Sequence, residues 1–200
     1  MELLAGYALE DEMKGGRVLP VTRALRIVVA VCEALAAAHR ACIVHRDIKP
    51  GNVFLHQAGG QEVPKVLDFG IAKIAGAVAL QQKVTLEGWI VGTPVYMAPE
   101  RFGSEEVTGE ADVYSVGIML FQMLAGRLPF EADSDPLAVA MKHKHDPPPP
   151  LRALRPDAPA AVEEAILSAL RKHPQQRPTA AELGARLAAA LPPSAVPPVS

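Results

Sequence analysis

His45-Arg46-Asp47-Ile48-Lys49-Pro50-Gly51-Asn52 is the most informative stretch of this 200-residue sequence, and Asp68-Phe69-Gly70 follows it after two short apolar runs. Asp47, Lys49 and Asn52 fall on one predicted loop between apolar segments. Any one of them alone would indicate only a polar turn. Together with the later aspartate they form a set of acidic, lysine and asparagine side chains that phosphoryl transfer can use directly.

Further motifs follow in order along the chain: Gly92-Thr93-Pro94-Val95-Tyr96-Met97-Ala98-Pro99-Glu100, then Asp112-Val113-Tyr114-Ser115-Val116-Gly117, and finally Arg177. With the stretches above, this ordered set resembles the protein kinase family, of the serine/threonine type. The resemblance covers nearly the whole chain, residues 1–191. It implies a transferase that uses ATP and Mg²⁺ and acts on serine and threonine residues of protein substrates.

The resemblance assigns catalytic roles to four side chains. Asp47 would accept the proton of the substrate hydroxyl, and Lys49 would steady the γ-phosphate. Asn52 and Asp68 would be oxygen ligands of Mg²⁺, and Phe69 would pack inward to fix the direction of the Asp68 side chain. Lysine at position 49 is the feature that makes the catalytic loop, residues 45–52, resemble that of a serine/threonine kinase.

Structural and regulatory roles follow for the residues beside them. A lone histidine is more often a buried core residue than a catalyst, and the resemblance also makes His45 a packing residue. Arg46 would bind a phosphate on the activation segment, residues 68–100, because a phosphate adds about two negative charges. Thr85 is the candidate phosphorylation site, with an ordinary exposed threonine as the alternative. Thr93 resembles the residue that bonds the catalytic aspartate and lysine.

Three charged residues have expected partners far away in the sequence. The resemblance pairs Glu100 with Arg177 as a buried ion pair beneath the substrate-binding floor. Asp112, at the start of a helix, would accept hydrogen bonds from the backbone N–H groups of the turn at His45 and Arg46. The alternative for all three is ordinary surface charge.

The nucleotide site is expected beside a hinge at residues 1–6. Glu2 and Leu4 would offer backbone groups to the adenine edge of ATP. Phe54 would form the lower face of the adenine slot or lie in the core, and these two readings are not exclusive.

The apolar pattern predicts an α+β fold that is mostly α, similar to the large C-terminal lobe of a protein kinase. Helices are expected over residues 9–14, 109–125, 133–145, 160–171 and 179–191. Another helix is expected to begin after an N-cap at Thr22 and to end near Arg40. The helix over 179–191 should begin with a capping box formed by Thr179 and Glu182. Residues 53–55 and 65–67 should form two strands around a turn at Gly59-Gly60. This hairpin would bring Asn52 and Asp68 to one end. Residues 192–200 resemble a proline-rich linker, and we find no internal repeat and no second domain.

Composition and charge restrict the class of partner. Half of the residues are apolar and the net charge is −2, so we expect a real core and do not expect nucleic acid as a partner. The most apolar run, residues 113–124, is interrupted by polar residues and is shorter than the roughly 20 residues that cross a bilayer. We expect a cytoplasmic protein without a membrane segment in this chain, and a parent protein could be anchored beyond the tail. Cys32 and Cys42 are expected to be buried small hydrophobes.

Two other patterns are interpreted without a ligand. Lys142-His143-Lys144-His145 could suggest a metal site, but no third ligand lies nearby in the sequence, and a solvated helix end is the preferred interpretation. Pro147-Pro148-Pro149-Pro150 is interpreted as a loop between helices rather than as a recognition site.

The sequence has no Gly-rich phosphate loop, no strand lysine in a Val-Ala-x-Lys context and no glutamate helix to pair with it. We therefore predict a serine/threonine protein kinase whose activity is weak or absent in these 200 residues alone. A missing N-terminal lobe, or a second copy in a homodimer, is a candidate partner. The alternatives are a non-catalytic interaction module built on a kinase lobe and a fragment of a larger kinase gene.

Overall fold

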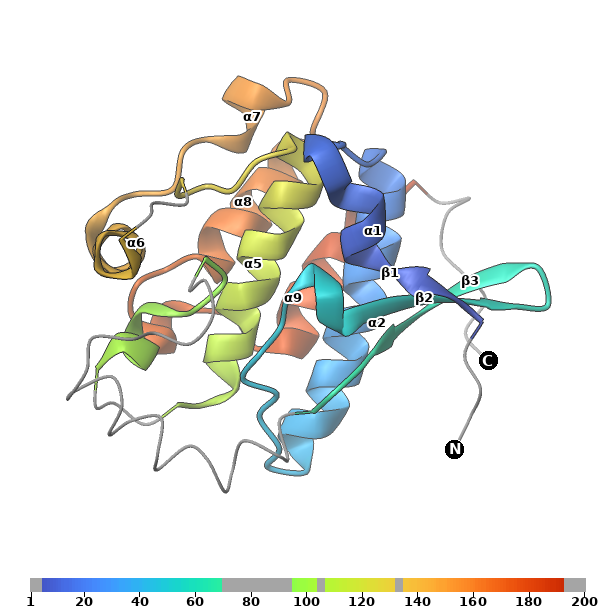
Figure 1. Ribbon diagram of the computed structural model, residues 1–200, viewed down its shortest axis with the longest axis horizontal. Coiled ribbons are helices and arrows are strands. Elements are labelled where there is room, and N and C mark those ends of the chain that lie inside the picture. Colours follow the sequence, from blue (N-terminus) through green and yellow to red (C-terminus); the bar gives the residue numbers. More distant parts are fainter. Residues whose placement is uncertain (1–4, 70–94, 104–106, 132–134, 193–200) are drawn as a thin grey trace.

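Helices make up most of the described chain, and a three-stranded sheet extends from one side of them (Figure 1). The computed structural model describes residues 5–69, 95–103, 107–131 and 135–192. The α-helices are α1 Leu9–Met13, α2 Val21–Arg40, α5 Gly109–Ala125, α6 Pro136–His145, α7 Leu151–Leu154, α8 Ala160–Ala169 and α9 Ala180–Ala189, and the 3-10 helices are η1 Lys14–Gly16, η2 Pro50–Asn52, η3 Pro99–Phe102 and η4 Pro174–Gln176. The predicted class, α+β and mostly α, is confirmed.

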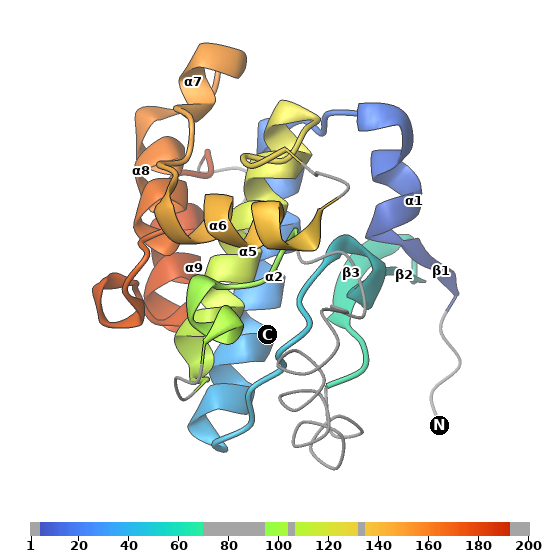
Figure 2. The ribbon, with the colours of Figure 1, turned by 60° about the vertical axis from the view of Figure 1, so that its left-hand side comes forward.

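Helix α5 is the central element of the helical part (Figures 1 and 2). Of its 17 residues, 13 are buried, so the helix has no solvent-facing stripe. It contacts α2, α7, α8 and α9. Gly126 ends it in the left-handed conformation, with φ of 71°. The prediction of a helix over 109–125 is confirmed.

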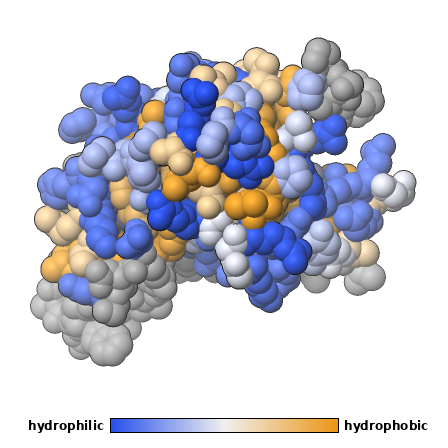
Figure 3. Space-filling view, turned by 90° about the horizontal axis from the view of Figure 1, so that it is seen from above, coloured by the Kyte–Doolittle hydropathy of each residue, from blue (hydrophilic) through white to orange (hydrophobic). Residues whose placement is uncertain are grey.

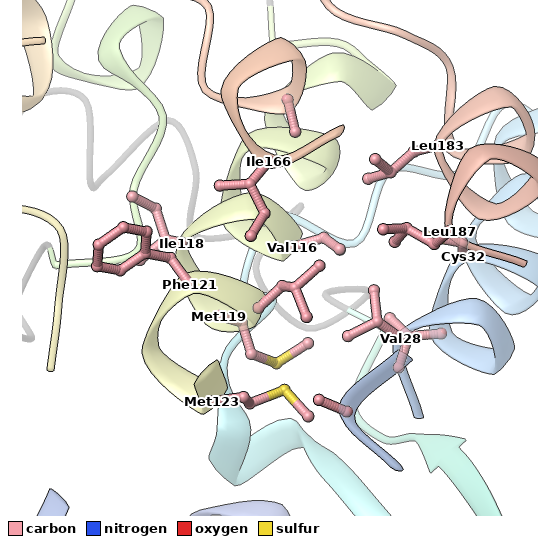
Figure 4. Packing of buried hydrophobic residues seen from close by; sticks show 14 of the residues in the cluster. Val28, Cys32, Val116, Ile118, Met119, Phe121, Met123, Ile166, Leu183 and Leu187 are labelled. Carbon is pink, nitrogen blue, oxygen red and sulfur yellow. The ribbon is translucent and has the colours of Figure 1, made fainter. Parts of the chain in front are cut away.

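Helix α2 packs along both α5 and α9. Its buried face includes Leu25, Val28, Cys32 and Leu35, which are at most 1% exposed. Figure 4 shows this core, in which labelled side chains of α2, α5, α8 and α9 meet in one cluster. Burial raises the pKa of the Cys32 thiol to about 12, so this cysteine stays a neutral core residue.

Two predictions for the ends of α2 are wrong. The N-cap is Pro20 rather than Thr22, because the Pro20 carbonyl accepts the first helical bonds, from the N–H groups of Arg23 and Ala24. Cys42 is exposed rather than buried. It lies in the turn that closes the helix, where its N–H donates to the His39 carbonyl and its φ is 58°.

The sheet has the order β1-β2-β3, with β1 Gly6–Ala8, β2 Val53–Ala58 and β3 Gln61–Val66, and both pairs are antiparallel. Strands β2 and β3 form the predicted hairpin around Gly59 and Gly60, whose positive φ values suit a two-residue turn. Both strands extend further towards that turn than predicted. Val53 pairs with Val66, so the residues before β2 and after β3 lie at the same end of the hairpin, as predicted.

The later helices agree with the predicted ranges except at their ends. Helix α6 begins only at Pro136, because Asp135 is its N-cap and accepts the Leu137 N–H at 2.9 Å. Helix α8 ends at Ala169, two residues before the predicted end. The capping box of α9 is confirmed, with Thr179 as the N-cap and Glu182 as its partner.

The interpretation of residues 142–145 as a solvated helix end is wrong for His143. This side chain is 0% exposed, whereas its neighbours Lys142, Lys144 and His145 are at least partly exposed. Four consecutive residues of a helix face different directions, and position 143 faces the core.

Figure 3 shows the molecule from above, with hydrophobic side chains in the middle of that face and mostly hydrophilic ones around them. Among the described residues, we find no helix with the length and apolar character needed to cross a membrane.

Candidate active site

The catalytic loop is tied to the start of α5 by one buried carboxylate. Asp112, which is 1% exposed, accepts the His45 N–H on Oδ2 and the Arg46 N–H on Oδ1, both at 2.8 Å. His39 Nε2, at the end of α2, lies 2.9 Å from the same Oδ2. The predicted contacts of Asp112 with the loop are therefore present. They hold Arg46 at a φ of 68°, a conformation that is uncommon for residues other than glycine.

Asp47, Lys49 and Asn52 are in direct contact. Lys49 Nζ lies 3.1 Å from Asp47 Oδ2. Asn52 Nδ2 donates to the Asp47 carbonyl at 2.7 Å and to Asp47 Oδ2 at 3.1 Å. All three side chains are partly open to solvent, so a substrate could reach the Asp47 carboxylate.

Asp68 joins this group through the hairpin. The Leu67 N–H donates to the Asn52 carbonyl at 2.9 Å, which places the residue after Leu67 beside the loop. His45 is 0% exposed, and its Nε2 lies 2.8 Å from the Leu67 carbonyl. Its ring packs on Phe69, with centroids 4.9 Å apart. His45 thus lies inside the fold, between the loop and the turn that carries Asp68.

Two oxygen donors of the site, from Asn52 and Asp68, suit a magnesium ion. Asn52 uses its Nδ2 group for Asp47, which leaves Oδ1 for a cation. The Asp68 carboxylate is exposed and has no partner within the described ranges. Amide and carboxylate oxygens are ligands that Mg²⁺ accepts, with the rest of its shell from phosphate and water.

A buried ion pair lies under the segment that precedes α5. Arg177 Nη1 lies 2.7 Å from Glu100 Oε1, and Nη2 lies 2.8 Å from Oε2. The two side chains are 0% and 2% exposed. The predicted pairing is therefore present, and it joins η3 to the chain just before α9.

Tyr96 is held by two side chains of α5. Ser115 Oγ donates to the Tyr96 carbonyl at 2.8 Å, and the Tyr96 hydroxyl donates to Gln122 at 2.6 Å. His143 of α6 contacts the same helix, because its Nδ1 lies 3.0 Å from the hydroxyl of Tyr114 in α5. Burial and the charge of Lys172 lower the pKa of His143 to about 4, while the Val95 backbone acts in the opposite direction. The Tyr96 backbone is therefore fixed on α5.

Several predicted site residues lie outside the described ranges: Glu2, Leu4, Thr85 and Thr93. Phe54 is half-buried on β2, opposite Ala8 of β1. Its position suits either a slot wall or part of the core, and its role stays a prediction.

The protein kinase domain family matches residues 1–186. The chain therefore belongs to the protein kinase family. Its relatives are bacterial serine/threonine kinases. The serine/threonine-protein kinase pkn3 of Myxococcus xanthus is 41% identical over 185 residues, which are 91% of this chain and 34% of that protein. The serine/threonine-protein kinase PksC of Streptomyces coelicolor is 43% identical over 177 residues, which are 88% of this chain and 31% of that protein.

Solved structures agree with this assignment. The PknI kinase domain of Mycobacterium tuberculosis matches with a TM-score of 0.71 and 28% identity, over 95% of this chain and 64% of that one. The kinase-like fold predicted from the motifs is confirmed. The chain spans about a third of the length of the two curated relatives above.

Sequence reasoning missed four residues near the site: His39, Arg101, Ser115 and His143. His39 lies at the end of α2, and its partner Asp112 is 73 positions away in the sequence. Ser115 lies inside a quoted motif, and its position one turn after Asp112 could have indicated a contact on the same helix face. Arg101 depends on a contact between distant segments, and no local pattern marks it. His143 lies in a pattern that was interpreted as a solvated helix end, and its burial was not expected.

Proposed function

We propose that this chain carries the part of a serine/threonine protein kinase that binds the substrate and activates its hydroxyl group. The observation that supports this most is the contact set of Asp47, Lys49 and Asn52, with Asp68 joined to it by the hairpin. The reaction would be ATP- and Mg²⁺-dependent phosphorylation of serine or threonine in proteins.

Each side chain has a distinct task in this proposal. Asp47 would accept the proton of the substrate hydroxyl and hold its oxygen in line with the γ-phosphate. Lys49 would place a positive charge near the same phosphate. Asn52 and Asp68 would hold Mg²⁺, which neutralises negative charge on the phosphates when it is bound.

Arg46 carries a proposed regulatory role. Its backbone is fixed by Asp112, and its side chain is half-buried at the surface of the loop. A phosphate on the activation segment, with Thr85 as the candidate, would pair with this guanidinium and order the segment. Thr93 would instead act by bonding to Asp47 and Lys49.

We further propose that these 200 residues alone transfer phosphate poorly. They contain no Gly-rich loop to cover the phosphates and no strand lysine for the α- and β-phosphates. Water would then screen the charge interactions at the open face of ATP.

The test is a phosphotransfer assay with radiolabelled ATP, Mg²⁺ and a serine-containing protein. We expect a slow reaction that Asp47→Asn abolishes, since the amide cannot accept the proton. Asp157→Asn is the matched control, because Asp157 is an exposed aspartate before α8.

The outcomes separate the alternatives. Transfer that survives in Asp47→Asn would contradict the assigned base. Robust transfer by the unaltered chain would contradict the low-activity proposal. A soluble, cooperatively folding chain without any transfer would favour the interaction module.

A further inference from the structure

The Arg46 peptide is the strained point of the catalytic loop, and it is held from two sides. Its φ of 68° lies in the left-handed region. Its N–H donates to Asp112 of α5 at 2.8 Å. Its carbonyl oxygen accepts a hydrogen bond from Nη1 of Arg101, a residue of η3. Neither of these two partners belongs to the loop itself.

Arg101 also places its charge among the acids of the site. Burial lowers the pKa of its guanidinium, and the negative charges of Asp47 and Asp112 act in the opposite direction. Within the part of the chain that the structure describes, no carboxylate forms an ion pair with Arg101. Among the described residues, the guanidinium donates a hydrogen bond to the Arg46 carbonyl.

The base of this side chain is rigid. Arg101 directly follows Glu100, which Arg177 fixes through two charge-assisted bonds. Its own N–H donates to the Ala98 carbonyl at 3.0 Å, within the first turn of η3. A guanidinium on such a base can hold its partner in one place.

We propose that Arg101 is a positioning residue of the catalytic loop. It holds the carbonyl of Arg46 so that the Asp47 carboxylate keeps its contacts with Lys49 and Asn52. The role rests on the proposed function, because it matters for catalysis only if Asp47 is the base. Arg101 acts through the backbone of the loop rather than on the reacting atoms.

The first test uses amide hydrogen exchange, followed by NMR on the ¹⁵N-labelled 200-residue chain. Arg101→Met removes the donors and the charge but keeps an apolar stem, and Arg101→Lys keeps the charge and a donor. Exchange at the Arg46 and Asp47 amides should accelerate about tenfold in the methionine variant, the effect of one lost hydrogen bond, and less in the lysine variant. Amides in the middle of α2 should not change.

The second test measures transfer kinetics on the same variants. In Arg101→Met, kcat should fall about tenfold while KM for ATP and for a serine peptide stays within about twofold, because only the loop that activates the hydroxyl has moved. Arg101→Lys should recover part of the loss. Arg152→Met is the matched control, since Arg152 is exposed on α7.

Each outcome decides the proposal. Equal acceleration of exchange in α2, α9 and the loop would make Arg101 a general stability residue, and unchanged exchange at Arg46 would also overturn the proposal. If Arg101→Met does not fold, Arg101→Gln replaces it in both tests. Failure of the proposed function would look different, because the wild-type chain would then show no Asp47-dependent transfer. The exchange experiment would still test whether Arg101 holds the Arg46 carbonyl.

Discussion

Arg177 uses every N–H of its guanidinium group. Besides the two bonds to Glu100, Nη1 donates to the Glu110 carbonyl at 3.0 Å, Nη2 to the Lys172 carbonyl at 2.9 Å and Nε to the Arg171 carbonyl at 2.7 Å. A buried pair of this kind contributes little net stability, because both charges lose their hydration. Removing one partner is costly, because the other charge stays buried.

Glu100→Gln tests, at the residue scale, what it costs to leave the buried Arg177 charge without its partner. The amide keeps the shape of the side chain but leaves the Arg177 charge unpaired, so the free energy of unfolding should fall by about 3–5 kcal/mol. Urea unfolding followed by circular dichroism measures it. Glu164→Gln is the control, because Glu164 is exposed on α8. A loss as small as that of the control would contradict a buried, fully paired arrangement.

Helix ends differ at the element scale even where the sequence looks alike. Both α5 and α9 have threonine as the N-cap, Thr108 and Thr179. Thr179 accepts the Glu182 N–H at 3.2 Å and donates its own N–H to the Glu182 carboxylate at 2.7 Å. Thr108 makes no side-chain cap. The same residue type therefore stabilises one helix start and not the other.

Alanine substitution separates the two caps. Thr179→Ala should lower the free energy of unfolding by about 1 kcal/mol, because the N–H groups of the first turn lose their acceptor. Thr108→Ala should change it by much less. Thermal unfolding of both variants provides the comparison, and equal losses would show that the capping box has no energetic role.

Gly126 and Gly15 give a second matched pair, because both have φ of 71°. A Cβ on Gly126 would lie 2.5 Å from the Gly16 carbonyl oxygen, whereas a Cβ on Gly15 would meet nothing within 4 Å. Alanine at either position costs about 1 kcal/mol for the left-handed backbone. Gly126→Ala should cost clearly more in chemical unfolding, since α5 and η1 must move apart. Equal costs would mean that this contact relaxes freely.

His143 links several elements at the scale of the whole molecule. Its ring lies near Phe102 of η3, Tyr114 of α5 and Phe130, with centroid distances of 6.3, 5.7 and 4.9 Å. Lys172 Nζ donates to the His143 carbonyl at 2.6 Å. Among the described residues, His143 Nε2 is a buried atom without a hydrogen-bond partner. Charging this ring would therefore disturb the packing of α6 on the rest of the fold.

The stability of the chain should depend on His143 in acid. Its pKa is about 4 in the fold and 6.5 in an unfolded chain, so the unfolded state binds a proton first as the pH falls. This contribution is fully present above pH 6.5 and is lost between pH 6.5 and about 4, by up to about 3 kcal/mol. Urea unfolding at several pH values should show that the free energy of unfolding changes less with pH in His143→Gln than in the wild-type chain. His145→Gln is the control, because His145 lies on the exposed side of the same helix, and its free energy of unfolding should change with pH as that of the wild-type chain does.

Local signals were enough for much of the fold. The period of apolar residues identified the main helices, the Gly59-Gly60 turn identified the hairpin, and Thr179 with Glu182 identified a cap, because each of these depends on neighbours within a few residues. The ordered motifs were enough for the kinase family. Three predictions failed. Pro20 rather than Thr22 caps α2, and Cys42 is exposed because it lies in the turn that closes this helix. His143 is buried because its position on α6 faces the core.

The tertiary structure was needed for those contacts between distant segments that no family motif marks. The hydrogen bond from Arg101 to the Arg46 carbonyl joins residues that are 55 positions apart, and the Tyr114–His143 contact joins residues that are 29 positions apart. Sequence spacing carries no information about such pairs, because the path of the chain between them sets which side chains meet. The residue types of the candidate site and the Asp112 support of its loop could therefore be expected from the motifs, whereas the Arg101 support of the same loop is a property of the folded chain.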